Sequence, residues 1–346
     1  MELTAATVAS TTDKVSFEGH SITISVIVVL LACIVIFIGI PSNIALIFAV
    51  ALSPKIRNLN NFIVANISFS GLVQLVTVIP WQLPSIISGT WPFKPWFCKG
   101  TFLISFITVD ALVNNMAILA IYRYFVVVRR RNYFLRKKRV VMTMVFIGWL
   151  IAITIPSVLM LVFFETSFIP EYGRCTQDQN DIKTAILYKF MTAAGILKGF
   201  VPLLFAYVRI FWEVRKHSMA VKSEGFDSQP SGRLGSQSHA QARGTNSGGQ
   251  DISRPRLLTQ REVTITFICA LNFLLFIICY GPIIIATAIF DGKGEGVPGD
   301  LQKMCTLMYW IGNTLNPVSY AIIHKDTRTA LFAFIRKTLC RRSPGR

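Results

Sequence analysis

The sequence predicts an all-α membrane protein: a bundle of seven transmembrane helices, followed by an amphipathic helix that lies in the membrane interface. Two observations favour this fold. Of the 346 residues, 53% are hydrophobic and only 15% are charged, a composition that suits a polytopic membrane protein better than a cytosolic enzyme. The apolar residues also gather into seven runs, each long enough to cross a bilayer, which takes about 20 residues.

Five of these runs are free of charged residues, and we expect each to form a span: 21–52, 58–93, 140–164, 263–290 and 304–323. The other two spans, 96–128 and 184–216, contain charges, among them Asp110 in the first and Lys189 and Lys198 in the second. A charge at membrane depth costs a few kcal/mol, so such residues usually face the interior of the bundle. They therefore indicate either a functional site or a structural ion pair.

The distribution of Lys and Arg predicts the orientation. The segment 129–139 holds seven basic residues and no acid, and more basic residues follow Tyr320, whereas the loops on the other side are mixed or acidic. Since basic loops stay on the cytoplasmic side, the amino terminus is expected outside and the carboxyl terminus inside. The net charge of +18 arises at the ends of apolar runs rather than in a polar domain, which argues against binding to nucleic acid.

These patterns divide the chain into three parts. Residues 1–20 form an extracellular tail, and 21–323 form the transmembrane domain, including a Ser-, Gly- and Gln-rich segment, 217–255, that we expect to be a disordered cytoplasmic loop. Residues 324–346 combine apolar and basic side chains and predict an interfacial helix with a short cytoplasmic tail in contact with membrane lipids. Cys340, at the end of this helix, is a candidate for palmitoylation.

Three cysteines, Cys98, Cys175 and Cys305, lie near the oxidising outer face. Their spacing alone allows three pairings. A bridge between two of them would restrict the loop between the fourth and fifth spans.

Short motifs on separate spans resemble those of the rhodopsin-like family of G-protein-coupled receptors. They are Asn43, Trp149 with Pro156, Ile121-Tyr122-Arg123-Tyr124, Phe276-Ile277-Ile278-Cys279-Tyr280-Gly281-Pro282 and Asn316-Pro317-Val318-Ser319-Tyr320. The resemblance implies a plasma-membrane receptor that converts binding of an extracellular ligand into activation of a heterotrimeric G protein. It further implies a Cys98–Cys175 disulfide, with arrestin and receptor kinases as additional partners. At a finer level, Trp91 to Cys98 and residues 207–210 resemble melatonin receptors and related orphan receptors.

The same motifs imply a conformational switch. Pro282 and Pro317 each remove a backbone hydrogen bond and kink their helices, although proline kinks in membrane helices are often only structural. Arg123 needs a partner near the inner membrane boundary, and the acid that usually precedes it in the family is Tyr122 here. Glu262 is then the expected partner in the inactive state; an arginine that merely snorkels is the alternative. Tyr207 and Tyr320 resemble the two tyrosines that close around this arginine in the active state.

Three departures from the family pattern concern ligands. Gly71 replaces the sodium-binding aspartate, so a hard cation lacks its carboxylate, and no metal or cofactor is expected. Tyr280 replaces the usual tryptophan of the switch and brings a hydroxyl that needs a partner. Ser105 stands where an amine-binding aspartate is expected, which argues against a protonated monoamine.

The expected ligand pocket is apolar with few polar groups and suits a small neutral or weakly acidic ligand. Its lining is Ser105, Phe106, Val109, Lys189, Tyr280, Ile284 and Trp310, the last in place of the retinal-binding lysine of opsins. Asp110 and Lys198 are expected to pair, which leaves Lys189 either to meet an anionic ligand group or to snorkel.

Two other classes of protein fit less well. A polytopic transporter would show an inverted repeat or a chain of charges at the membrane midplane, and neither is evident in the sequence. An enzyme would need a nucleophile with a base or a metal-spaced His and Cys cluster, and the sequence shows neither pattern.

Overall fold

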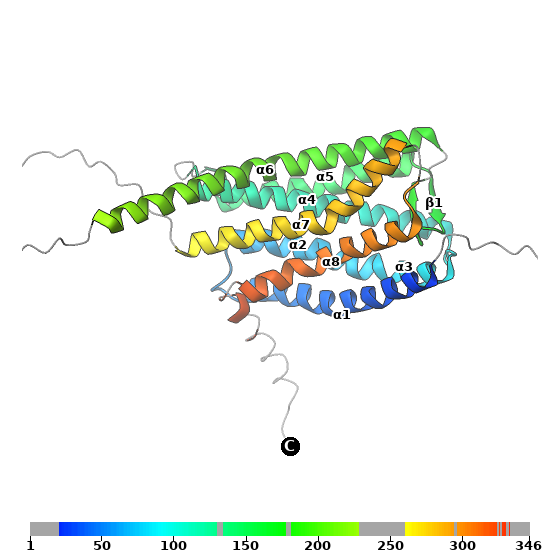
Figure 1. Cartoon of the computed structure of the whole chain (residues 1–346), viewed down its shortest axis with the longest axis horizontal. Helices are drawn as coiled ribbons and strands as arrows, with labels where there is room; N and C mark the ends of the chain where they lie inside the picture. The colour runs from blue at the N-terminus through cyan, green and yellow to red at the C-terminus, as the bar shows by residue number, and fades with distance from the viewer. Residues whose placement is uncertain are drawn as a thin grey trace, which may run out of the picture.

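A computed structural model of the chain describes residues 21–129, 134–177, 181–227, 260–293 and 296–323, and beyond these 325, 327–329 and 332. The helices run side by side as an elongated bundle, with a small β-hairpin at one end (Figure 1). The helices and strands are α1 (Ile22–Leu52), α2 (Leu59–Thr77), α3 (Ile79–Ser88), α4 (Pro95–Val127), the 3₁₀ turn η1 (Phe134–Arg136), α5 (Lys138–Val162), β1 (Thr166–Ile169), β2 (Arg174–Gln177), α6 (Ile182–Asp227), α7 (Gln260–Lys293) and α8 (Gly299–Ile323).

These helices form the seven expected spans. Within the described residues, six helices are long and apolar enough to cross a membrane: α1, α2, α4, α5, α6 and α7. The helix α8 packs against α1 and α7 and completes the bundle. The second span consists of two helices, because the chain breaks between α2 and α3 at Val78, two residues before Pro80. A proline clashes with the carbonyl four residues earlier, so a helix kinks or ends just before it.

The sixth helix of the structure is longer than the sequence indicated. α6 continues to Asp227, so residues 217–227 are helical and do not belong to the disordered loop expected over 217–255. Up to Gly225 this stretch contains Met, Ala, Lys and Glu and no proline, so the helix continues until shortly after that glycine. Residues 228–259 lie outside the described residues.

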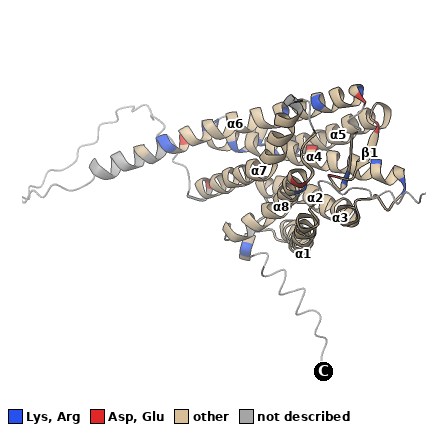
Figure 2. Cartoon of the chain, turned by 45° about the vertical axis from the view of Figure 1, so that its right-hand side comes forward, with Lys and Arg blue, Asp and Glu red and all other residues tan. Residues whose placement is uncertain are grey.

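Polar side chains are buried inside the bundle and apolar side chains cover its outside. Asn43 and Asn115 are fully buried, whereas Phe37 on α1 is 81% exposed and Phe146 on α5 is 68% exposed. Charged residues are sparse along the helices (Figure 2). This arrangement suits a bundle in lipid, where interior polar groups bond from helix to helix and apolar groups face the acyl chains.

One end of the bundle, which we call the disulfide end, is closed by the β-hairpin. Strands β1 and β2 are antiparallel, and Cys175 on β2 is bridged to Cys98 at the start of α4, so the expected disulfide is confirmed. The hairpin turns at Gly173, which has a φ of 62° and lies where a Cβ would come within 2.8 Å of Ile86 on α3. Only glycine fits this backbone conformation and this close approach.

The opposite end, which we call the Arg123 end, carries the chain beyond α8. The described residues there, 325, 327–329 and 332, are helical, as the expected interfacial helix requires. Most of that helix and Cys340 lie outside the described residues. The amino-terminal tail, 1–20, lies outside them as well.

Candidate functional site

A cavity of about 380 Å³ opens among α4, α6, α7 and α8 beneath strand β2. Its volume falls within the range of about 300–1,000 Å³ that is typical of small-molecule sites. Its wall is mainly aromatic and aliphatic, with a few polar groups. Six of the seven residues expected from the sequence line it: Ser105, Phe106, Val109, Lys189, Tyr280 and Ile284.

The seventh expected residue, Trp310, does not line this cavity. It is 1% exposed and belongs to the main hydrophobic core, and Tyr309 takes its place in the cavity wall. With 3.6 residues per turn, a shift of one position rotates a side chain by about 100° around its helix, enough to exchange the two residues between core and cavity.

A buried polar network supports the wall beside Tyr309. Gln74 on α2 donates to the Ser105 hydroxyl at 3.1 Å and accepts a hydrogen bond from Thr108. The hydroxyls of Ser105 and Tyr309 lie 3.5 Å apart. The position where an amine receptor would hold a carboxylate therefore carries neutral hydroxyl and amide groups.

Asp110 is the one acid among the lining residues, and it is paired. Lys198 on α6 donates to its carboxylate at 2.6 Å, and Asn114 donates to the same carboxylate at 3.2 Å while bonding the Gly148 carbonyl of α5 at 3.0 Å. The Asp110 side chain is 15% exposed and that of Lys198 is 40% exposed. This ion pair ties α4 to α6 and neutralises the negative charge in the wall.

Sequence reasoning missed Arg174, which lines the cavity from strand β2. Its backbone is fixed on one side by the bridged Cys175 and on the other by Gly173, whose carbonyl accepts a hydrogen bond from the buried Ser85 at 3.0 Å. Two short runs rich in β-forming residues around Pro170 to Gly173 are a hairpin signal that could have placed this residue over the bundle.

Below the cavity, aromatic side chains connect α7 to α8. Tyr280 stacks on Phe276, with ring centroids 4.4 Å apart, and meets Tyr309 edge-on at 5.0 Å. The Tyr280 hydroxyl donates to Asn313 at 3.3 Å, which supplies the partner that this hydroxyl was expected to need. Gly312 makes the close approach possible, since a Cβ there would lie 2.9 Å from the Tyr280 ring.

Gly71 stands where the family has its sodium-binding aspartate, and the main chain of α8 lies close to it. A Cβ on Gly71 would lie 3.1 Å from the Asn313 carbonyl oxygen and 3.5 Å from the Asn43 amide oxygen. Asn43 itself bonds that carbonyl at 3.2 Å. Across the described part of the chain, no three His, Cys, Asp or Glu side chains group to hold a metal ion.

Arg123 lies at the other end of α4 and binds α7. It is 3% exposed, and its guanidinium donates at 3.1 Å both to the main-chain carbonyl of Glu262 and to the hydroxyl of Thr266. The hydroxyl of Thr266 in turn donates to the Glu262 carbonyl at 2.8 Å. Of the neighbouring motif residues, Tyr122 packs half-buried against the core and Tyr124 accepts a hydrogen bond from Arg129 at 3.4 Å.

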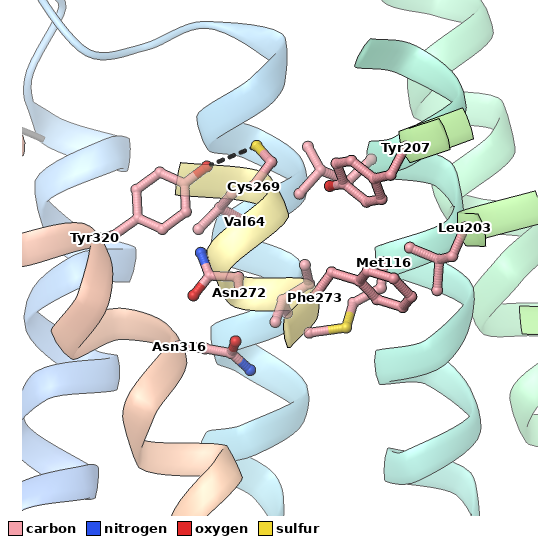
Figure 3. Close-up of a pocket in the computed structure, with 11 residues that line it drawn as sticks. Val64, Met116, Leu203, Tyr207, Cys269, Asn272, Phe273, Asn316 and Tyr320 are labelled. Carbon is pink, nitrogen blue, oxygen red and sulfur yellow. Dashed lines mark hydrogen bonds between the residues drawn. The ribbon is translucent and has the colours of Figure 1, made fainter. Parts of the chain in front are cut away.

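Tyr207 and Tyr320 face each other across a void of about 10 Å³ (Figure 3). Tyr207 stacks on Phe273 of α7 at 5.4 Å. Tyr320 accepts a hydrogen bond from Asn60 of α2 at 3.0 Å, and its oxygen lies 3.6 Å from the Cys269 sulfur. Each tyrosine thus has contacts of its own with α7 or α2.

Both proline motifs lie inside helices of the structure. Pro282 is within α7, and Pro317 is within α8 next to Asn316. Ser319 bonds Asn272 of α7 and the Asn316 carbonyl, the latter at 2.8 Å. These contacts join α7 and α8 between the cavity and the Arg123 end.

Residues 42–320 match the family model described as 7 transmembrane receptor (rhodopsin family). Among curated proteins, the chain is 23% identical to the guinea pig (Cavia porcellus) histamine H2 receptor over 325 residues, covering 91% of this chain and 79% of the receptor. It is 22% identical to neuropeptide Y receptor type 1 of Xenopus laevis, in a match that covers 87% of this chain and 78% of that receptor. The crystal structure of squid rhodopsin superposes with a TM-score of 0.71 at 18% identity, covering 92% of this chain and 88% of rhodopsin.

Proposed function

Because the chain belongs to the rhodopsin family of seven-transmembrane receptors, we propose that a ligand in the cavity at the disulfide end moves α7 at the Arg123 end. Family membership makes the chain a multi-pass plasma-membrane receptor that couples to heterotrimeric G proteins, and not an enzyme. The match leaves the alternative of a transporter without support.

The observation that carries the proposal is the attachment of Arg123 to α7. Its two hydrogen bonds go to Glu262 and Thr266, both in the first turns of that helix. In this arrangement the guanidinium is buried against α7 and cannot reach a partner beyond the bundle. Movement of this end of α7 away from α4 breaks both bonds and exposes a cationic group for the G protein.

The aromatic stack supports a route from the cavity to this attachment. Tyr309 and Tyr280 line the cavity, Tyr280 stacks on Phe276, and Pro282 lies two residues beyond Tyr280 on the same helix. A ligand that displaces Tyr280 therefore acts on α7 beside its proline, where the missing backbone hydrogen bond makes the helix easiest to bend.

The cavity wall supports a small ligand that is not a protonated monoamine. The histamine H2 receptors among the relatives are named for an amine, but here Ser105 bonds Gln74, and the one lining acid, Asp110, is bound by Lys198. A cationic ligand would find no free carboxylate among the residues that line the cavity.

The remaining assignments complete the proposal. The basic segment 129–139 and the disulfide support an extracellular amino terminus and an intracellular Arg123 end. Arrestin and receptor kinases are proposed to use this intracellular end, and Cys340 is proposed to carry a lipid that anchors the tail.

A ligand screen read through several chimeric G proteins tests the proposal. Val109→Trp fills the cavity and is expected to abolish the response to a hit while leaving basal nucleotide exchange in place. Val158→Trp, on the exposed outer face of α5, is the matched control and should respond like the wild type. Ligand-dependent uptake of a substrate without any G-protein response would overturn the proposal.

A further inference from the structure

The cavity at the disulfide end contains a cation, Arg174, for which the described residues supply no carboxylate partner. Arg174 is part of its wall, and the Nε of this side chain is buried with no hydrogen-bond partner among the described residues. The residue as a whole is half-buried, and a buried donor without a partner is costly, so an anion that accepts from Nε stabilises this side chain. Asp110 does not neutralise Arg174, because its carboxylate is paired with Lys198.

The position of Arg174 is fixed before any ligand binds. The neighbouring disulfide, the turn at Gly173 and the antiparallel pairing with Ile169 hold its backbone, and Tyr172 packs against α7 and α8. A donor that is already in place loses little entropy on binding, which favours affinity.

The rest of the cavity wall indicates the chemistry of the part of the ligand that does not contact Arg174. Beyond Arg174 the wall is mainly apolar, with side chains such as Phe106, Val113 and Ile284, and Lys189 of α6 adds a second cationic group to it. Tyr309 interacts electrostatically with Arg174, and its hydroxyl lies 3.5 Å from that of Ser105 in the same wall. The cavity thus has a guanidinium at the strand, an ammonium on α6 and a mainly apolar wall, and of the two cations only the guanidinium offers a fork of donors.

We infer that the ligand is an apolar carboxylic acid whose carboxylate binds the guanidinium of Arg174 while its hydrocarbon part fills the cavity between α4, α6 and α7. An arginine presents a planar fork of N–H donors that matches the two oxygens of a carboxylate, whereas an alcohol or an amine cannot use it. This inference rests on the proposed function, since it identifies the chemical class of the receptor's ligand.

The test uses the full-length receptor in lipid nanodiscs and follows its thermal unfolding midpoint as octanoic acid is added. Octanol and octylamine serve as probes of the same chain length without the carboxylate. Arg174→Gln removes the charge, and Arg174→Lys keeps the charge but loses the fork. Lys183→Gln removes a positive charge at the same end of the bundle from an exposed residue that does not line the cavity.

Octanoic acid is expected to raise the midpoint of the wild type and of Lys183→Gln with the same apparent Kd. Loss of a charge-assisted bidentate contact should weaken this Kd by about 10- to 100-fold in Arg174→Gln. Octanol should change the unfolding midpoint of the wild type and of every variant by the same amount. If Arg174→Gln does not fold, Arg174→Lys provides the test, and its affinity for octanoic acid should be several-fold weaker than that of the wild type.

Equal Kd values for octanoic acid in the wild type and the Arg174 variants would overturn the inference, as would a wild type that octanoic acid stabilises no more than octanol does. Such a result would show an arginine with a structural role only. Basal nucleotide exchange by the Thr266→Val variant is measured separately and without ligand, so failure of the switch and failure of the carboxylate site are distinguishable.

Discussion

Removing the hydroxyl of Thr266 should raise basal signalling, because this hydroxyl is one of two acceptors that attach Arg123 to α7. Thr266→Val keeps the branched shape of the side chain but cannot accept the guanidinium's hydrogen bond at 3.1 Å. The Glu262 carbonyl belongs to the main chain and remains. The variant therefore weakens the attachment without abolishing it.

The size of the effect follows from the burial of the bond. A hydrogen bond to a charged group contributes about 1.5–3 kcal/mol, and some of this is regained when the second acceptor remains, which leaves about 1–2 kcal/mol. Since 1.4 kcal/mol is about tenfold in an equilibrium, the inactive-to-active ratio should fall by about 5- to 30-fold. While the active state is the minor one, basal activity rises by the same factor.

The assay is basal nucleotide exchange on a panel of chimeric G proteins, normalised to the amount of receptor at the cell surface. Thr266→Ser keeps the hydroxyl and should match the wild type. Thr264→Val changes an exposed threonine two residues away on the same helix and should also match it. Basal activity of Thr266→Val equal to that of both controls would refute the reasoning.

Gly71→Ala should lower the thermal unfolding midpoint, because the new methyl group lies 3.1 Å from a carbonyl oxygen of α8 and overpacking of this kind costs about 1–3 kcal/mol of stability. Gly100→Ala is the control and should leave the midpoint unchanged, because its methyl group meets no atom within 4 Å. Asp110→Asn and Lys198→Met should each lower the free energy of unfolding, and the double variant should lower it by about 1 kcal/mol less than the sum of the two single losses. Additive losses would mean that the 2.6 Å ion pair contributes nothing. The hydrogen bonds from Thr184 lower the pKa of the Asp181 carboxyl, so its stabilising contribution is present above the unfolded-state pKa and is lost as the pH falls through the folded-state pKa. The protection factors of amides at the start of α6, corrected for the intrinsic pH dependence of exchange, should therefore fall on acidification in the wild type, and a wild type whose protection factors change with pH like those of Asp181→Asn would contradict this.

The sequence was sufficient to predict the seven spans, since span length and charge exclusion are set by the bilayer itself. The disulfide came from the family resemblance, because three cysteines near one face allow three pairings. Chain breaks were harder to place. The end of α2 at Thr77 depends on how the kink near Pro80 packs, and the extension of α6 to Asp227 was missed because the polar composition of 217–255 does not show where the helix ends.

The candidate site was only partly predictable for a related reason. Trp310 was expected in the cavity because it stands in place of the retinal-binding lysine of opsins, but Tyr309, one position earlier, lies there instead. Arg174 was missed because a local hairpin signal does not show where the hairpin lies: its place over the cavity depends on a disulfide to Cys98 and a contact with Ser85, both distant in sequence. Glu262 was expected as the partner of Arg123, but the sequence does not show that its main-chain carbonyl and the Thr266 hydroxyl are acceptors.

The most direct test of the account is the distance between α4 and α7 at the Arg123 end, measured by double electron–electron resonance between labels at Arg129 and Thr264, both exposed. Glu262 lies roughly 30 Å along the helix from Pro282 at 1.5 Å per residue, so a bend of about 15° at the proline moves this end by about 8 Å. The account predicts that the label distance lengthens by several ångströms when the receptor is bound to its G protein. An identical distance distribution in the free and the G-protein-bound receptor would contradict it.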